Sequence, residues 1–141
     1  MFYLIAALLL YTVAILLLSL ANKSLNSNLV TAIVNTVAAI IPIGVVMSSF
    51  EKKIFDNAKF GIIISIVIGV VIGLYTLVLS KSFAENKVGI VTPIIFGGAI
   101  FLSTILSTII FKEKISMLQG VGLGFLGIGF LIIIYVKATT N

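Results

Sequence analysis

The sequence predicts an all-α integral membrane protein, organised as one bundle of five transmembrane helices. Of its 141 residues, 61% are hydrophobic and only 9% are charged, and the mean hydropathy is +1.36. A water-soluble fold of this composition would lack the polar residues that cover a surface. The chain also contains five apolar stretches without Asp, Glu, Lys or Arg, each close to the roughly 20 residues that a helix needs to cross a bilayer.

The first predicted helix covers residues 2–20. A cleaved signal peptide is the alternative, because Ser19 and Ala21 match the small-residue pattern of a cleavage site. The apolar stretch is longer, however, than the roughly 7 to 15 residues of a signal core, and no Lys or Arg precedes it. We therefore interpret this stretch as a membrane helix.

The second and third predicted helices, residues 29–50 and 61–80, each carry a line of small or polar side chains at helical spacing. The lines consist of Thr31, Asn35, Pro42 and Ser49 in the second helix and of Ser65, Gly69, Gly73, Thr76 and Ser80 in the third. A single Ser or Thr is best explained by close packing and by a bond to its own helix backbone. Asn35 differs, because an amide has four hydrogen-bonding capacities to satisfy where water is absent. A packing role and a functional or gating role both stay open for it.

The fourth predicted helix, residues 88–111, has a polar face. Thr92, Phe96, Ser103 and Ser107 fall within about 60° of arc on a helical projection. Three helices therefore offer small or polar faces that can converge on a shared interior. We predict that these four side chains line a substrate cavity together with Asn35 and Thr76.

The same helix carries the signs of a bend. Pro93 lacks a backbone N–H and crowds the carbonyl four residues earlier, while Gly97 and Gly98 leave a site without side chains near mid-membrane. Irregular backbone at membrane depth is tolerated where it is buried in protein or lines a cavity. We predict a hinge at Pro93, Gly97 and Gly98, with a simple packing kink as the alternative.

The fifth predicted helix, residues 118–136, is rich in glycine. Gly120, Gly124 and Gly127 share one face, and no strand precedes them as a phosphate-binding loop would require. Together with Gly69 and Gly73 of the third helix, we interpret them as helix-packing surfaces, one of which could be a dimer seam.

The connections between the five stretches are short and hold the charges, so successive helices run antiparallel and residues 1–141 form a single membrane domain. Five lysines accompany the N-terminus on one side, namely Lys52, Lys53, Lys59, Lys112 and Lys114, and four lie opposite, namely Lys23, Lys81, Lys87 and Lys137. The small excess favours an N-terminus inside and a C-terminus outside the cell. Because the lysine counts on the two sides are nearly equal, insertion in both orientations is also permitted, and with it an antiparallel pair of copies.

From the third helix onward, several short motifs follow one another in a fixed order: residues 91–94 ("VTPI") open the fourth helix, Glu113 lies beyond its far end, and Gln119 and Gly120 open the fifth. In this order and spacing the sequence resembles the EamA unit of the drug/metabolite transporter superfamily. Earlier in the chain, "LANKSL" matches the lysine that this family often has after its first helix.

The sequence also departs from that family. It has no Trp in the first helix, and Lys112 stands where a Gly commonly precedes the Glu. Most relatives carry two such units in tandem with inverted orientation, whereas this chain has one. The resemblance therefore implies that one unit needs a partner, either a second copy or a paralogous subunit.

Composition argues against several function classes. The chain has no His or Cys, its nine basic residues are all lysine, and no acid lies in an apolar stretch. Metal centres, thiol nucleophiles and bidentate phosphate clamps therefore lack their residues, and we predict no metal, no cofactor and no enzymatic activity. The net charge of +5 is spread over the loops, where anionic lipid headgroups explain it without nucleic acid.

We therefore expect a multi-pass transporter of the cell membrane that moves a small metabolite, neutral or zwitterionic, by alternating access as a dimer. The alternative is a non-transporting membrane subunit that docks a larger complex through its glycine faces.

Overall fold

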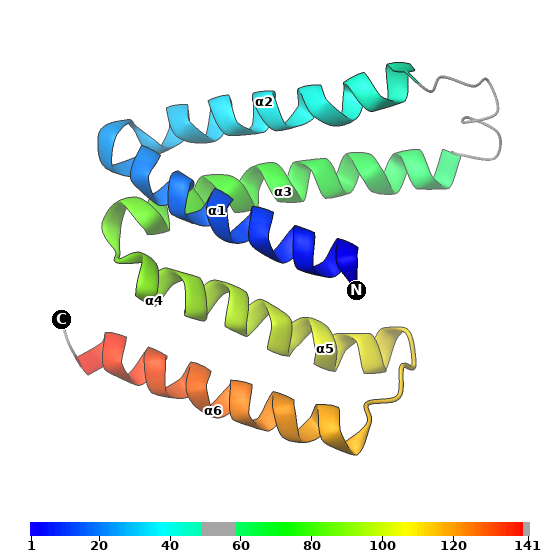
Figure 1. The fold of residues 1–141 in the computed structure, drawn as a ribbon, viewed down its shortest axis with the longest axis vertical. Coiled ribbons are helices and arrows are strands. Elements are labelled where there is room, and N and C mark those ends of the chain that lie inside the picture. Colours follow the sequence, from blue (N-terminus) through cyan, green and yellow to red (C-terminus); the bar gives the residue numbers. More distant parts are fainter. Residues whose placement is uncertain (49–58, 140–141) are drawn as a thin grey trace. The chain divides into compact units, whose positions relative to one another are not determined.

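The computed structural model describes residues 1–48 and 59–139. Within these ranges the fold is all-helical, and five helices are long and apolar enough to cross a membrane (Figure 1). The predicted fold class is confirmed to that extent. The number and order of the predicted helices are confirmed as well.

The helices extend beyond the apolar stretches that predict them. Their bounds are Phe2–Ser24 for α1, Ser27–Ser48 for α2, Lys59–Glu85 for α3, Val88–Thr92 for α4, Pro93–Gly97 for the π-helical turn η2, Gly98–Ile110 for α5 and Met117–Thr139 for α6. With 27 residues, α3 is about 40 Å long, more than the roughly 30 Å hydrocarbon core. Charged residues at its ends can therefore lie at headgroup depth. The predicted end of the second helix, residues 49–50, lies outside the described residues.

Local hydrogen bonds explain where two helices begin. Asn26 Oδ1 accepts a hydrogen bond of 2.9 Å from the N–H of Asn28, which caps the start of α2. At α6, Ser116 Oγ accepts from the N–H of Gln119 at 3.2 Å, while Gln119 Oε1 accepts from the N–H of Ser116 at 3.1 Å. This reciprocal pair is a capping box, so each helix starts slightly before its apolar stretch.

The chain divides into two compact units, Met1–Glu85 and Asn86–Asn141. In the first unit, α3 packs against both α1 and α2 (Figure 1). Its buried side chains lie toward the α1–α2 connection and the C-terminal end of α3. They are Ile15, Ser19, Asn22, Val30, Thr31, Leu79, Ser80 and Phe83. Half of these are polar, so the first unit is held together at that end by hydrogen bonds as well as by apolar contacts.

In the second unit, the segment from α4 through η2 to α5 folds back against α6 (Figure 1). Two glycines make this contact close. A Cβ atom added at Gly98 would lie 3.1 Å from the ring of Phe130, and one added at Gly127 would lie 3.2 Å from the ring of Phe101. Each helix thus offers one glycine and one phenylalanine, three residues apart, and each ring lies against the glycine of the opposite helix.

Candidate functional site

Polar side chains of α2 and α3 meet partway along the two helices. Asn35 Nδ2 donates a 2.8 Å hydrogen bond to Thr76 Oγ1. The Thr76 hydroxyl lies 3.0 Å from the carbonyls of Ile72 and Gly73 and so donates to its own helix, and Thr31 Oγ1 approaches the Thr76 carbonyl at 3.4 Å. The structure therefore brings together Asn35 and Thr76, two of the residues that the sequence places in a cavity.

A second polar contact joins α1 to α3 near the C-terminal ends of both helices. Asn22 Nδ2 donates to the Leu18 carbonyl at 2.8 Å and to Ser80 Oγ at 3.3 Å. A carbonyl only accepts, so the nitrogen of the Asn22 amide must face Leu18 and its oxygen must face away. Within the described residues, Asn22 Oδ1 is buried without a hydrogen-bond partner. Sequence reasoning missed Asn22 because it lies just beyond the predicted end of the first helix.

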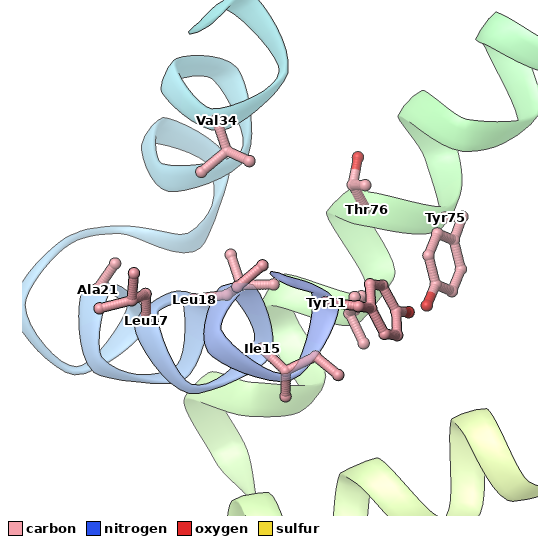
Figure 2. A pocket seen from close by; sticks show the side chains of 10 residues that line it. Tyr11, Ile15, Leu17, Leu18, Ala21, Val34, Tyr75 and Thr76 are labelled. Carbon is pink, nitrogen blue, oxygen red and sulfur yellow. The ribbon is translucent and has the colours of Figure 1, made fainter. Parts of the chain in front are cut away.

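A cavity of about 400 Å³ lies among α1, α2 and α3. Most of its lining is aliphatic, and three lining residues carry a hydroxyl (Figure 2). The lining residues are Tyr11, Ala14, Ile15, Leu17, Leu18, Ala21, Val34, Tyr75, Thr76 and Leu79. None of these ten is charged, so a solute in this cavity would have no counter-ion within its walls.

Two tyrosines form one end of this cavity. The hydroxyls of Tyr11 and Tyr75 hydrogen-bond to each other, and Figure 2 shows their oxygens side by side. Tyrosines of membrane proteins gather at the two membrane–water interfaces, which suits Tyr3 and Tyr135 near their helix ends. Tyr11 and Tyr75 instead lie in the interior of α1 and α3. A tyrosine in the middle of an apolar stretch is the sequence signal that distinguishes these two residues.

Of the six predicted cavity residues, Thr76 lines this cavity and Asn35 borders it through its bond to Thr76. The other four belong to the second unit. Ser103 and Ser107 donate to carbonyls of their own helix, at 3.1 Å to Ile100 and 2.9 Å to Thr104. Thr92 Oγ1 is buried and has no partner among the described residues, and Phe96 is half-buried. Their role in a cavity stays a prediction.

The backbone departs from α-helical geometry at the predicted bend. Pro93–Gly97 form one π-helical turn, η2, between α4 and α5. Pro93 has no N–H to give the carbonyl four residues earlier, and a wider turn is one way for a helix to accommodate that loss. A second cavity of about 270 Å³ adjoins this turn, lined by Pro93, Gly97, Leu126, Gly129, Phe130 and Ile133. The irregular geometry is thus observed at the predicted residues, and its use as a hinge stays a prediction.

The five glycines predicted to pack helices differ in their surroundings. Gly127 lies against Phe101, as described above. At Gly69, Gly73, Gly120 and Gly124, an added Cβ would meet nothing within 4 Å. These four glycines therefore make no such close contact within their own units, and their packing role stays a prediction.

The described residues contain no cluster of three His, Cys, Asp or Glu side chains that could hold a metal ion. Comparison of the chain with protein-family models, with curated proteins and with solved structures gives no match. The resemblance to the EamA unit therefore rests on the sequence motifs alone.

Proposed function

We propose that this protein is a multi-pass transporter of the cell membrane that moves small solutes by alternating access. One five-helix chain would act with a partner, either a second copy, parallel or antiparallel, or a paralogous subunit. The observation that supports this proposal best is the cavity of about 400 Å³ beside the Asn35–Thr76 hydrogen bond, within helices long enough to cross a membrane.

Packing alone explains this arrangement less well. Polar groups in membrane helices do serve to hold helices together, and the Asn35–Thr76 bond does so for α2 and α3. The space beside this pair, however, is a half-open pocket that the side chains of α1, α2 and α3 leave unfilled. A volume of several hundred cubic ångströms next to a polar pair has the size of a small-molecule site, roughly 300 to 1,000 Å³.

The cavity favours an uncharged solute over a zwitterion. None of the ten lining side chains carries a charge, and a charge taken into an apolar site without a partner is strongly disfavoured. A zwitterion would place two such charges there at once. We therefore propose a neutral solute, and give a zwitterionic solute second place.

The π-helical turn supports the conformational part of the proposal. Such turns often occur at functional sites, and interrupted helices are a common device in secondary transporters. In this chain the turn lies inside the fourth apolar helix, next to a cavity. It gives the helix a place at which its two segments can change their angle.

Solute flux into reconstituted vesicles tests the proposal. A panel of labelled alcohols, amides, sugars and amino acids would be assayed with and without imposed pH and sodium gradients. For the solute that moves, Asn35→Leu and Thr76→Val should each lower the flux. Thr36→Val is the matched control, because the Thr36 hydroxyl is bonded to the Ala32 carbonyl of its own helix at 2.8 Å. If no solute on the panel moves faster than through protein-free vesicles, transport is the wrong function.

A non-transporting membrane subunit is the second candidate, and the open glycines favour it. Gly120 and Gly124 leave space on α6 where a partner helix could approach. Gly124→Leu should weaken association with a partner under both proposals. Asn35→Leu separates them, because it should stop flux in a transporter and leave the assembly of a docking subunit unchanged.

A further inference from the structure

Four buried side chains form a layer between α1 and α3 near the C-terminal ends of both helices. They are Ser19, Asn22, Ser80 and Phe83, and we call them the closing layer. Ser80 has no exposed surface, Phe83 is 1% exposed, and Ser19 and Asn22 are 2% and 7% exposed. Three of the four are polar, which is unusual for the best-packed part of a unit whose helices are otherwise apolar.

The closing layer continues the walls of the cavity of about 400 Å³. Asn22 lies one turn beyond Leu18 on the same face of α1, and Ser80 lies one turn beyond Thr76 on α3. Leu18 and Thr76 both line the cavity (Figure 2). Beyond the layer the helices soon end, since α1 stops at Ser24 and α3 at Glu85. The closing layer therefore lies between this end of the cavity and the membrane surface.

The packed layer leaves one hydrogen-bonding group of Asn22 unsatisfied. Asn22 Nδ2 donates to the Leu18 carbonyl and, at 3.3 Å, to Ser80 Oγ, whereas Asn22 Oδ1 is buried without a partner among the described residues. A buried acceptor without a partner costs free energy, which is regained when water reaches it. The bond to Ser80 is also long for an N–H···O contact. Hydration thus favours the separation of α1 and α3 here, while burial of the apolar groups opposes it.

We infer that the closing layer is a gate of this cavity. In the open state, α1 and α3 separate at Asn22 and Ser80, water hydrates Asn22 Oδ1, and a solute passes between the cavity and the membrane surface. The inference rests on the proposed function for what passes through the gate, but the opening itself does not depend on transport. A permanent contact between the helices would be served better by apolar side chains, which leave no unpaired acceptor.

Thiol labelling tests the opening, because the chain has no cysteine of its own. Ser19→Cys places a thiol in the closing layer, and Ser24→Cys places one at the exposed end of α1 as an accessible reference. Each variant is reacted in lipid nanodiscs with the charged thiol reagent MTSET, which reaches both membrane faces. We expect Ser19→Cys to react completely but at least about tenfold more slowly than Ser24→Cys, because its thiol is reached only in the open state.

Two further changes, each made in the Ser19→Cys variant, should shift this rate in opposite directions. Asn22→Leu removes the unpaired acceptor and puts an apolar side chain in its place, so the reaction should slow by about tenfold. Ser80→Ala removes the hydrogen bond between the helices, so the reaction should become several-fold faster. Thr12→Val is the matched control and should leave the rate unchanged, because the Thr12 hydroxyl donates to the Leu8 carbonyl of its own helix at 2.8 Å.

A contact that only holds the helices together predicts a different pattern. Asn22→Leu would then loosen the layer and speed up the labelling of Ser19→Cys. That result would overturn the inference. So would a Ser19→Cys thiol that reacts as fast as the Ser24→Cys thiol, or one that never reacts.

Crosslinking connects the gate to solute flux. Dibromobimane joins two neighbouring thiols and fluoresces only when both have reacted, so it reports the link between Asn22→Cys and Ser80→Cys in a double variant. Flux through the double variant should be lost in proportion to the crosslinked fraction. The same treatment of the cysteine-free chain should leave its flux unchanged.

The gate and the proposed function fail in different ways. If labelling behaves as expected but no solute on the flux panel moves, transport is wrong and the opening of this layer stands. If a solute moves and its flux survives crosslinking, the gate is wrong and transport stands.

Discussion

Gly98 of α5 faces one edge of the Phe130 ring of α6, so that a Cβ atom there would lie 3.1 Å from two of the ring carbons. The same relationship is repeated in reverse between Gly127 and Phe101. Because the two helices of the second unit run in opposite directions, these contacts form a reciprocal pair. The pair fixes the register between α5 and α6 and sets how closely their backbones approach.

Gly98→Leu should therefore destabilise the second unit. A leucine cannot fit without displacing Phe130, and overpacking of this kind costs about 1 to 3 kcal/mol. Thermal unfolding in detergent, followed by circular dichroism, should show a lower midpoint. Gly122→Leu is the matched control, because a side chain at Gly122 meets nothing within 4 Å and leucine favours the helix. An unchanged midpoint for Gly98→Leu would show that the ring moves aside freely.

Replacing Lys112 by glycine should make the protein more stable. It follows α5 with a φ of 54°, the left-handed conformation that side chains other than glycine adopt only with strain. This is also the position at which the family that the sequence resembles commonly has a glycine. Lys112→Gly should raise the free energy of unfolding by up to about 1 kcal/mol, measured by denaturant titration. Lys114→Gly should give no gain, because Lys114 has no positive φ.

The hydrogen bond between Asn35 and Thr76 should appear as a coupling in a double-mutant cycle. Asn35→Leu, Thr76→Val and the double variant would be compared by unfolding in detergent. The coupling should be close to the 0.6 kcal/mol average for membrane helices and at most about 2 kcal/mol. The same cycle for Asn35 and Thr36, whose hydroxyl bonds its own helix, should give none. A coupling of zero between Asn35 and Thr76 would remove this pair as the structural support of the cavity.

The sequence predicted the helices well because a single requirement determines them. Every backbone group in lipid must be bonded within its own segment, so five apolar stretches of sufficient length become five helices. It also predicted that small or polar faces of the second, third and fourth helices can converge on one interior; Asn35 and Thr76 do meet, and the convergence with the fourth helix stays a prediction. Helical periodicity carries that information because polar side chains in apolar surroundings seek one another.

The helical periodicity of the sequence could not show which face of each helix contacts another helix. Gly124 and Gly127 are three residues apart on the same predicted face, yet Gly127 lies against Phe101 and Gly124 is open. The difference depends on how α5 crosses α6, which no single helix encodes. The Tyr11–Tyr75 contact was missed for the same reason, since it joins residues far apart in the chain. The sequence thus identified polar groups that needed partners but not the aliphatic cavity beside them.

Pro93→Ala tests whether the π-helical turn acts as a hinge. Alanine restores the N–H that the carbonyl four residues earlier lacks, so the π-helical turn at Pro93–Gly97 should tighten into a continuous α-helix. We expect a higher thermal midpoint, because proline inside a helix is unfavourable by about 3 kcal/mol relative to alanine. Flux should fall if the turn is the hinge of a transporter.

Pro42→Ala is the control for this experiment. Pro42 also lies inside a helix, α2, but that helix continues through it without a π-helical turn. Its replacement should raise the midpoint without lowering flux. If Pro93→Ala raises stability and leaves flux at the level of Pro42→Ala, the turn at Pro93 accommodates a proline and nothing more, and the conformational change must take place elsewhere in the chain.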